Sequence, residues 1–218
     1  YDIRLSLVGS EMCIRDRNYL APQFEYFGKG HNIMGARYFD VYGSNISIDD
    51  YPTMVASPDN YIHLTTWSLE DHEGEISIGK YCLLTPGVRI ASASKISIGD
   101  GCMFANSAYV SDADWHGIYD RAIPVGKSSP ITLEENVWIG DRAMIGKGVT
   151  IGKNSIVAAG AVVVKDVPDN VIAPTPFIAL SKISKFKLTY KQIKNQNYDE
   201  LKNKLIEIFK NNLKNLIF

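Results

Sequence analysis

A short segment in the middle of the chain gathers residue types that could carry out proton transfer. It reads Ser111-Asp112-Ala113-Asp114-Trp115-His116-Gly117-Ile118-Tyr119-Asp120-Arg121. The imidazole of His116 can act as a general base near neutral pH. Either carboxylate, Asp112 or Asp114, could orient that ring. The alternative is a surface histidine that packs on Trp115.

The other side chains of this segment suggest what His116 could act on. Aromatic rings stack on the faces of pyranose rings, and a guanidinium binds hydroxyl or phosphate groups. We therefore expect Trp115, Tyr119 and Arg121 to bind a substrate, with Tyr109 close to them. A sugar unit destined for a surface polysaccharide is the first expectation for the acceptor, and an antibiotic or another small amphiphile is the second.

A six-residue repeat defines the elements that must position this segment. An apolar residue recurs at Leu133, Ile139, Ile145, Ile151, Val157 and Val163, and four places after each one stands a small or β-branched residue. Period six is neither the 3.6 of a helix nor the alternation of a plain strand. It is typical of a solenoid with three short faces per coil. The pattern predicts an all-β fold, the left-handed parallel β-helix, with an ordinary β-sandwich as the alternative.

The same unit occurs upstream with less regular spacing. Its apolar positions are Ile78, Leu84 and Ile90, then Ile98, Phe104 and Val110, and Ile48, Met54 and Ile62 suggest a first coil. We expect about five coils and part of a sixth, in a β-helix domain of residues 48–180. The repeat is interrupted between Val110 and Leu133, so residues 115–132 are expected to leave the coil as a loop. Loops on rigid scaffolds are frequent sites of function.

The two ends of the chain differ from the repeat. Residues 1–17 resemble a translated sequencing adapter and are expected to be non-native. Residues 18–47, rich in aromatic residues and glycine, are expected to cap the first coil. Residues 181–218 predict a basic amphipathic C-terminal α-helix that is cut short, and we expect it to dock on the solenoid or on a neighbouring subunit rather than on a membrane.

Composition limits the function classes. The chain has 218 residues, 45% of them hydrophobic, and a formal net charge of −1, which argues against general affinity for nucleic acid. The apolar runs are too short for a transmembrane segment. Cys82 and Cys102 occupy equivalent positions on neighbouring coils, within reach of a disulfide. Because no export signal is recognised, we expect reduced thiols and a cytoplasmic protein.

Three stretches resemble the hexapeptide-repeat acyltransferases. They are Asn136–Gly140, Ile151–Ser155 and Val163–Val171, within a wider resemblance over residues 76–180. The most similar members are galactoside and maltose O-acetyltransferases, with xenobiotic acetyltransferases further away. The resemblance implies a homotrimer with active sites in the clefts between neighbouring solenoids. It also implies acetyl-CoA as the donor.

The resemblance assigns roles to individual residues. His116 matches the catalytic histidine, which would deprotonate a hydroxyl or amine as it attacks the thioester. The family has a substrate-side asparagine in the region where this chain has Leu84 and Thr85. The nearest asparagine in this chain is Asn106, one coil later, and it could take that role. The residues at the matching cofactor positions, or near enough to replace them, are Trp138, Asp141, Ala159, Val164, Lys165 and Lys182.

Three alternatives remain open from the sequence. A catalytically silent β-helix scaffold would make the side chain of His116 dispensable. A carbonic-anhydrase-like zinc enzyme needs three convergent histidines, and His63, His72 and His116 do not share a place in the repeat, so no metal is expected. Within the acyltransferase class, the donor could carry a longer acyl group or be an acyl carrier protein.

Overall fold

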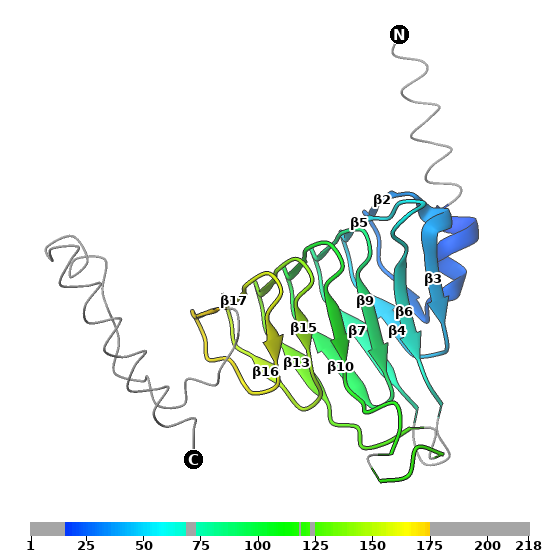
Figure 1. The fold of residues 1–218 in the computed structure, drawn as a ribbon. Coiled ribbons are helices and arrows are strands. Elements are labelled where there is room, and N and C mark those ends of the chain that lie inside the picture. Colours follow the sequence, from blue (N-terminus) through cyan, green and yellow to red (C-terminus); the bar gives the residue numbers. More distant parts are fainter. Residues whose placement is uncertain (1–15, 69–72, 118, 123–124, 175–218) are drawn as a thin grey trace, which may run out of the picture. The chain divides into compact units, whose positions relative to one another are not determined.

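The strands wind into coils that stack along one axis, from β2 and β3 at the blue end of Figure 1 to β17 at its yellow end. The computed structural model describes residues 16–68, 73–117, 119–122 and 125–174. Each complete coil gives one strand to each of three parallel sheets, named A, B and C here. This architecture is the left-handed parallel β-helix that the repeat predicts.

The sheets follow the order of the coils. Sheet A contains β1 (Tyr26–Phe27), β4 (Ile46–Ile48), β7 (Glu75–Ile78), β10 (Lys95–Ile98), β13 (Ile131–Leu133) and β16 (Thr150–Ile151). Sheet B contains β2 (Asn32–Met34), β5 (Thr53–Val55), β8 (Leu83–Leu84), β11 (Met103–Phe104), β14 (Trp138–Ile139), β17 (Ile156–Val157) and β19 (Ile172–Ala173). Sheet C contains β3 (Phe39–Tyr42), β6 (Ile62–Thr66), β9 (Arg89–Ser92), β12 (Tyr109–Ser111), β15 (Met144–Ile145) and β18 (Val162–Val163).

The register of the strands confirms the inward positions of the repeat. Leu133 pairs with Ile98 on one side and Ile151 on the other. Phe104 pairs with Ile139 in the same way in sheet B. These side chains are buried in one continuous core. The six-residue spacing therefore stacks equivalent apolar residues at the strand separation of a parallel sheet, about 4.8 Å.

The first coil begins earlier than the sequence predicts. Residues 18–47 were expected to form a cap, which is wrong for residues 26–42, because β1, β2 and β3 pair with β4, β5 and β6. The stack therefore has six coils and a seventh strand in sheet B, β19, rather than five coils and part of a sixth. The short helices η1 (Asp16–Leu20) and η2 (Ala21–Gln23) precede β1, and η3 (Ala36–Tyr38) connects β2 to β3.

The second coil also differs in register. Leu64, not Ile62, pairs with Ile90 at the position that the repeat assigned to Ile62. Strand β6 has five residues, and both Ile62 and Leu64 are fully buried. A longer strand offers two inward positions, so apolar spacing alone could not choose between them.

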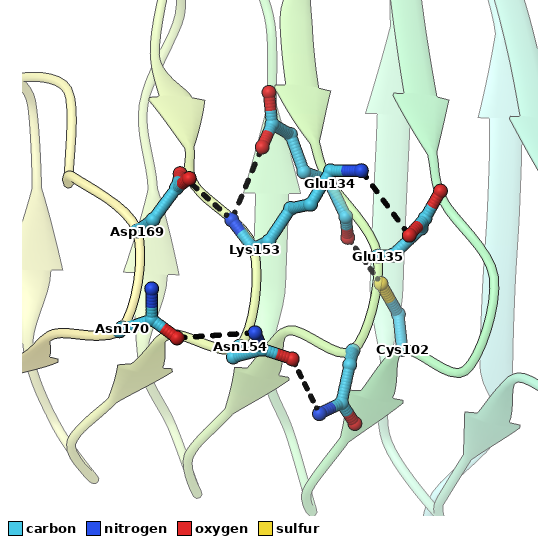
Figure 2. Close-up of polar contacts among 8 residues, drawn as sticks. Cys102, Glu134, Glu135, Lys153, Asn154, Asp169 and Asn170 are labelled. Atoms are coloured by element: carbon cyan, nitrogen blue, oxygen red, sulfur yellow. Dashed lines mark hydrogen bonds and ion pairs between the residues drawn. The ribbon is translucent and has the colours of Figure 1, made fainter.

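The corner between sheets A and B repeats one backbone conformation. Its equivalent positions with positive φ are Gly30, Tyr51, Tyr81, Gly101, Asn136, Asn154 and Asn170. Asparagine tolerates this left-handed region better than most residues. The Asn136 amide donates to Asn154 at 3.0 Å, and the Asn154 amide donates to Asn170 at 3.1 Å, the second of which Figure 2 shows.

Charged groups reinforce the same corner. The backbone N–H of Lys153 lies 3.1 Å from a carboxylate oxygen of Glu134 and of Asp169, and its ammonium lies 3.2 Å from Glu135 (Figure 2). The thiol of Cys102 donates to the carbonyl of Glu134 at 3.0 Å. This edge is thus occupied by contacts that join successive coils.

Several expectations concern residues outside the described ranges. These are residues 1–15 of the segment expected to be non-native, Lys182, and the helix expected over residues 181–218. In the part of the chain that is described, no helix is long and apolar enough to cross a membrane.

Candidate active site

The segment with His116 leaves the stack where sheet C turns into sheet A. It runs from Asp112 to Pro130, between β12 and β13, and projects from one edge of the stack (Figure 1). The expected loop of residues 115–132 is therefore shifted, because Ile131 and Thr132 already belong to β13. The connections β6–β7 and β9–β10 turn at the same edge, so this corner can hold insertions without disturbing the core.

The two ends of this loop pair with each other before the chain reaches His116. The N–H of Asp114 donates to the carbonyl of Lys127 at 3.0 Å, and the N–H of Ser129 donates to the carbonyl of Asp112 at 2.8 Å. The N–H of Gly126 completes the root with a 2.6 Å bond to the carbonyl of Asp114. His116 follows this paired root by two residues, and its side chain is exposed. The root therefore restricts where the imidazole can lie.

Asp112 holds the loop from inside the protein. Its carboxylate is fully buried and accepts hydrogen bonds from the Ser92 hydroxyl and the Ala93 N–H, both at 2.7 Å. A third bond, of 2.9 Å, comes from the N–H of Ser94. These donors belong to the wide corner of the preceding coil, between β9 and β10. The structure thus gives Asp112 a positioning role for the backbone.

Asp114 is engaged by a lysine of the next coil. Its carboxylate contacts the ammonium of Lys147, which also donates to the carbonyl of Lys127 at 3.2 Å. Lys147 therefore contacts both arms of the loop root. Among the described residues, neither Asp112 nor Asp114 shares a hydrogen bond with His116, so the orientation of that ring by a carboxylate stays a prediction.

The expected substrate-binding residues fall into two places. The half-buried Trp115 donates its indole N–H to the hydroxyl of Tyr109 at 3.2 Å. Tyr119 is fully exposed, and the Arg121 guanidinium donates to the carbonyl of Gly117, so both belong to the outer loop. Asn106 lies apart from them, at the corner between sheets B and C, where it accepts a 2.8 Å bond from the hydroxyl of Ser107.

The expected cofactor residues also lie in separate places, on the outer face of sheet B and at the two corners of sheet C. Trp138 points outward from β14 and is 44% exposed. Asp141 and Ala159 occupy equivalent places at the corner between sheets B and C, and the N–H of Gly160 bonds the carbonyl of Asp141 at 2.7 Å. Val164 and Lys165 follow β18 at the other corner of sheet C, the one that carries the His116 loop.

Within one chain, sheet C separates these two groups. His116, Val164 and Lys165 lie along one edge of the sheet, whereas Asp141 and Ala159 lie along the other. A single copy therefore does not bring all predicted site residues together. The structure adds a neighbour that the sequence pattern did not reveal, because the ring centroid of Trp67 lies 5.9 Å from that of Trp115.

The three histidines within the described residues do not converge. His63 pairs with Asp40 at 3.1 Å, and His31 packs against Phe27, far along the chain from the His116 loop. Over the described ranges, no three His, Cys, Asp or Glu residues are placed to hold a metal ion, and His72 lies outside those ranges.

Comparison with known proteins identifies the repeat. Residues 130–165 match the family model described as "Bacterial transferase hexapeptide (six repeats)". The chain carries the bacterial transferase hexapeptide repeat. The matched residues are those in which the six-residue spacing, from Leu133 to Val163, is unbroken. The predicted similarity to hexapeptide-repeat acyltransferases is confirmed.

Several proteins similar to this chain are named as O-acetyltransferases. A galactoside O-acetyltransferase of Escherichia coli is 37% identical over 100 residues, which are 45% of this chain and 49% of the relative. One from Lactococcus lactis is 48% identical over 73 residues, 32% of this chain and 35% of the relative. A maltose O-acetyltransferase structure from Clostridium difficile shows 28% identity and a TM-score of 0.47, covering 72% of this chain and 68% of that one. The chain spans about half the length, or less, of these curated relatives.

Proposed function

We propose that this protein transfers an acetyl group from acetyl-CoA to a hydroxyl, or an amine, of a small acceptor, and that the acceptor is a sugar. The observation that carries this proposal is the exposed imidazole of His116 on a loop whose root is fixed to a hexapeptide-repeat stack. The relatives named as galactoside O-acetyltransferases support the same reaction class.

The chemistry needs one base and good alignment. His116 takes the proton of the acceptor group as its oxygen or nitrogen attacks the thioester carbonyl. The new ester or amide forms as the carbon–sulfur bond breaks, and the CoA thiolate leaves and recovers the proton from His116. Because the acceptor attacks directly, no acyl-enzyme is required. Most of the acceleration then comes from holding the two reactants about 3–3.5 Å apart.

The proposed donor site suits a long, thin cofactor with phosphates at one end. Lys165 is exposed at the edge that carries His116, and an ammonium can bind a phosphate as a point charge. At the opposite corner, Ala159 and Gly160 are exposed, and a Cβ at Gly160 would meet no atom within 4 Å. The pantetheine arm could approach that backbone closely. Trp138, Asp141, Val164 and Lys182 complete the proposed set.

We propose a homotrimer, the assembly that the family resemblance implies. Sheet C separates the two groups of site residues within one chain, so they can meet only where the edges of two copies face each other. The side chains that point outward from each sheet form rows, and these rows favour sheet B as the face between subunits. In sheet A the row begins with Tyr26 and continues with Ser47, Ser77, Ser97, Thr132 and Thr150. In sheet B it begins with the polar Asn32 and Thr53 and is apolar from the third coil onward, at Leu83, Met103, Trp138, Ile156 and Ile172. An exposed apolar row of this kind is typical of a protein–protein interface. We also propose that the protein is cytoplasmic, where acetyl-CoA is available as the donor.

The test is an acceptor screen with purified protein and labelled acetyl-CoA. We expect label on at least one sugar, and we expect His116→Ala to lower kcat by about 10²–10⁴, the usual effect of losing a general base. His31→Ala, in the first coil, serves as the matched control and should leave the rate unchanged. An unchanged rate in His116→Ala would contradict the proposed base, and no transfer to any acceptor would favour a scaffold. A monomer by light scattering would contradict the shared site.

A further inference from the structure

A circuit of large side chains covers part of the outer face of sheet C, beside the His116 loop. The ring centroid of Tyr42 lies 6.1 Å from that of Trp67, which in turn lies 5.9 Å from Trp115. The indole of Trp115 donates to the hydroxyl of Tyr109, and the guanidinium of Arg89 lies 5.4 Å from the centroid of the Tyr109 ring. These contacts connect four coils along one edge of the stack.

Two further side chains, Asp40 on β3 and His63 on β6, complete the ring of contacts next to Arg89 on β9. His63 and Arg89 are direct partners in neighbouring strands, and Asp40 pairs with the Nδ1 of His63 at 3.1 Å. Asp40 and Tyr42 are two residues apart on β3 and therefore lie on the same face of the sheet. We call these side chains the rim; they are Asp40, Tyr42, His63, Trp67, Arg89, Tyr109 and Trp115.

Small side chains lie inside the rim. Thr65 pairs in register with Tyr42 on one side and with Ala91 on the other. Both Thr65 and Ala91 alternate with buried residues, so their side chains face outward like the rim. Large residues thus surround two small ones, and the whole set is named the sheet C patch.

The chemistry of the sheet C patch is that of a sugar-binding surface. Aromatic rings offer flat apolar faces for the C–H groups of a pyranose, while hydroxyl groups need both donors and acceptors. The rim supplies rings together with a guanidinium, an imidazole and a carboxylate. The large rings are accessible, since Tyr42 is 62% exposed and Trp67 is 44% exposed.

The outward row itself argues against a second copy of the chain at this place. On the first four coils that row reads Asp40, His63, Arg89 and Tyr109, whereas on the next two it becomes aliphatic, Met144 and Val162. Interfaces between identical subunits are depleted of charged residues at their centre. A polar ligand with flat apolar faces matches the first four coils better.

We propose that the sheet C patch binds one sugar unit of a glycan whose neighbouring unit lies at His116. Trp115 joins the two places, because it belongs to the rim and directly precedes His116 in the chain. The acceptor class is then an oligosaccharide or a glycan end rather than a single sugar. This inference rests on the proposed acetyl transfer for its biological meaning, but the binding itself does not depend on catalysis.

Binding is measured by calorimetry in the absence of acetyl-CoA, with galactose, galactotriose, glucose and maltotriose as probes. We expect at least one trisaccharide to bind about tenfold more tightly than its monosaccharide, the effect of one well-stacked ring. Trp67→Ala should abolish that difference, while Trp67→Phe, which keeps a ring, should preserve most of it. Tyr26→Ala removes an exposed ring from sheet A and should change nothing.

Three results would overturn the patch. They are equal affinity for trisaccharides and monosaccharides, an undiminished preference in Trp67→Ala, or a change in the mass of the assembly in Trp67→Ala, which would assign the rim to a subunit interface. Labelled transfer, measured in parallel, separates the two proposals. Acetyl transfer without a preference for trisaccharides would support the proposed function and reject the sheet C patch. A preference for trisaccharides without any acetyl transfer would support the patch and reject the proposed function.

Discussion

The carboxylate of Asp112 accepts a hydrogen bond of 2.7 Å from the hydroxyl of Ser92, one coil earlier in the stack. Two backbone N–H groups, of Ala93 and Ser94, donate to the same carboxylate. Asp112 is fully buried, so water does not compete for these bonds. The loop that carries His116 therefore begins at a fixed point of the scaffold.

Replacing Asp112 should destabilise the fold rather than only the site. Asp112→Ala removes the acceptor of three donors, and we expect the free energy of unfolding to fall by about 3 kcal/mol or more. Ser92→Ala, the control, removes one donor and should cost about 1 kcal/mol. Guanidinium unfolding followed by circular dichroism measures both. Equal losses in the two variants would contradict the role of Asp112 at this corner.

Lys147 should control the rate of the reaction more than the stability of the protein. Its ammonium contacts Asp114 and the carbonyl of Lys127, one on each arm of the loop root. Lys147→Met should reduce kcat severalfold, because His116 is then less well positioned, while unfolding changes by less than about 1 kcal/mol. Lys153→Met, which removes an exposed ion pair with Glu135, should leave kcat unchanged. An unaffected rate in Lys147→Met would show that the loop does not need this contact.

Lys165 should affect the donor and not the acceptor. A lysine that binds a CoA phosphate contributes about 1–3 kcal/mol through a charge-assisted bond, so Lys165→Ala should raise KM for acetyl-CoA roughly tenfold with kcat little changed. Lys95→Ala removes a lysine from the outer face of sheet A and, as the control, should leave KM for acetyl-CoA unchanged. Steady-state kinetics at saturating acceptor give both constants. A normal KM in Lys165→Ala would remove this residue from the donor site.

The asparagine ladder allows backbone strain to be separated from hydrogen bonding. Asn154 has a φ of +56° and bonds both Asn136 and Asn170. Asn154→Ala loses the two bonds and keeps a Cβ in the left-handed region without the side-chain amide, whereas Asn154→Gly loses the same bonds and also removes the Cβ. We expect the alanine variant to be less stable than the glycine variant by about 1 kcal/mol. Thermal unfolding of the pair measures this difference, and identical melting temperatures would contradict it.

The two buried thiols should be chemically protected. A hydrogen bond with the Cys102 thiol, together with burial, raises the pKa of Cys82, whereas the same hydrogen bond lowers the pKa of Cys102. Both side chains are fully buried, so the protection of Cys102 rests on its inaccessibility to the reagent. The thiolate is the reactive form, so folded protein carrying Cys13→Ser should not react with Ellman's reagent at pH 8. The same variant in guanidinium should release two equivalents of the coloured product, which is the control. Rapid labelling of the folded protein would show that this corner opens.

The inward residues of the β-helix were predictable because each depends on its neighbours in sequence. Leu133, Ile139 and Ile145 sit six apart, the length of one strand plus one corner, so spacing alone assigns them to the core. Prediction was wrong at Ile62, where a longer strand offers two buried positions. It also missed the first coil, because Val41 lies eight residues after Ile33 rather than six.

The roles of polar residues were less predictable. Asp112 and Asp114 have the types expected beside a general base, but their partners come from other coils, Ser92 and Lys147. No local pattern records which carboxylate faces the core and which faces the loop. The location of His116 could be predicted, since it requires only that the repeat be interrupted.

The sequence by itself determined the three-sided winding and the place where the chain departs from it, because a six-residue period of apolar side chains is a local property that leaves one low-energy way to bury them. Only the tertiary structure decided that Asp112 supports a corner, that Trp67 meets Trp115, and that sheet C divides the predicted site. Those contacts join different coils, and stacking places residues side by side that the order of the chain keeps far apart.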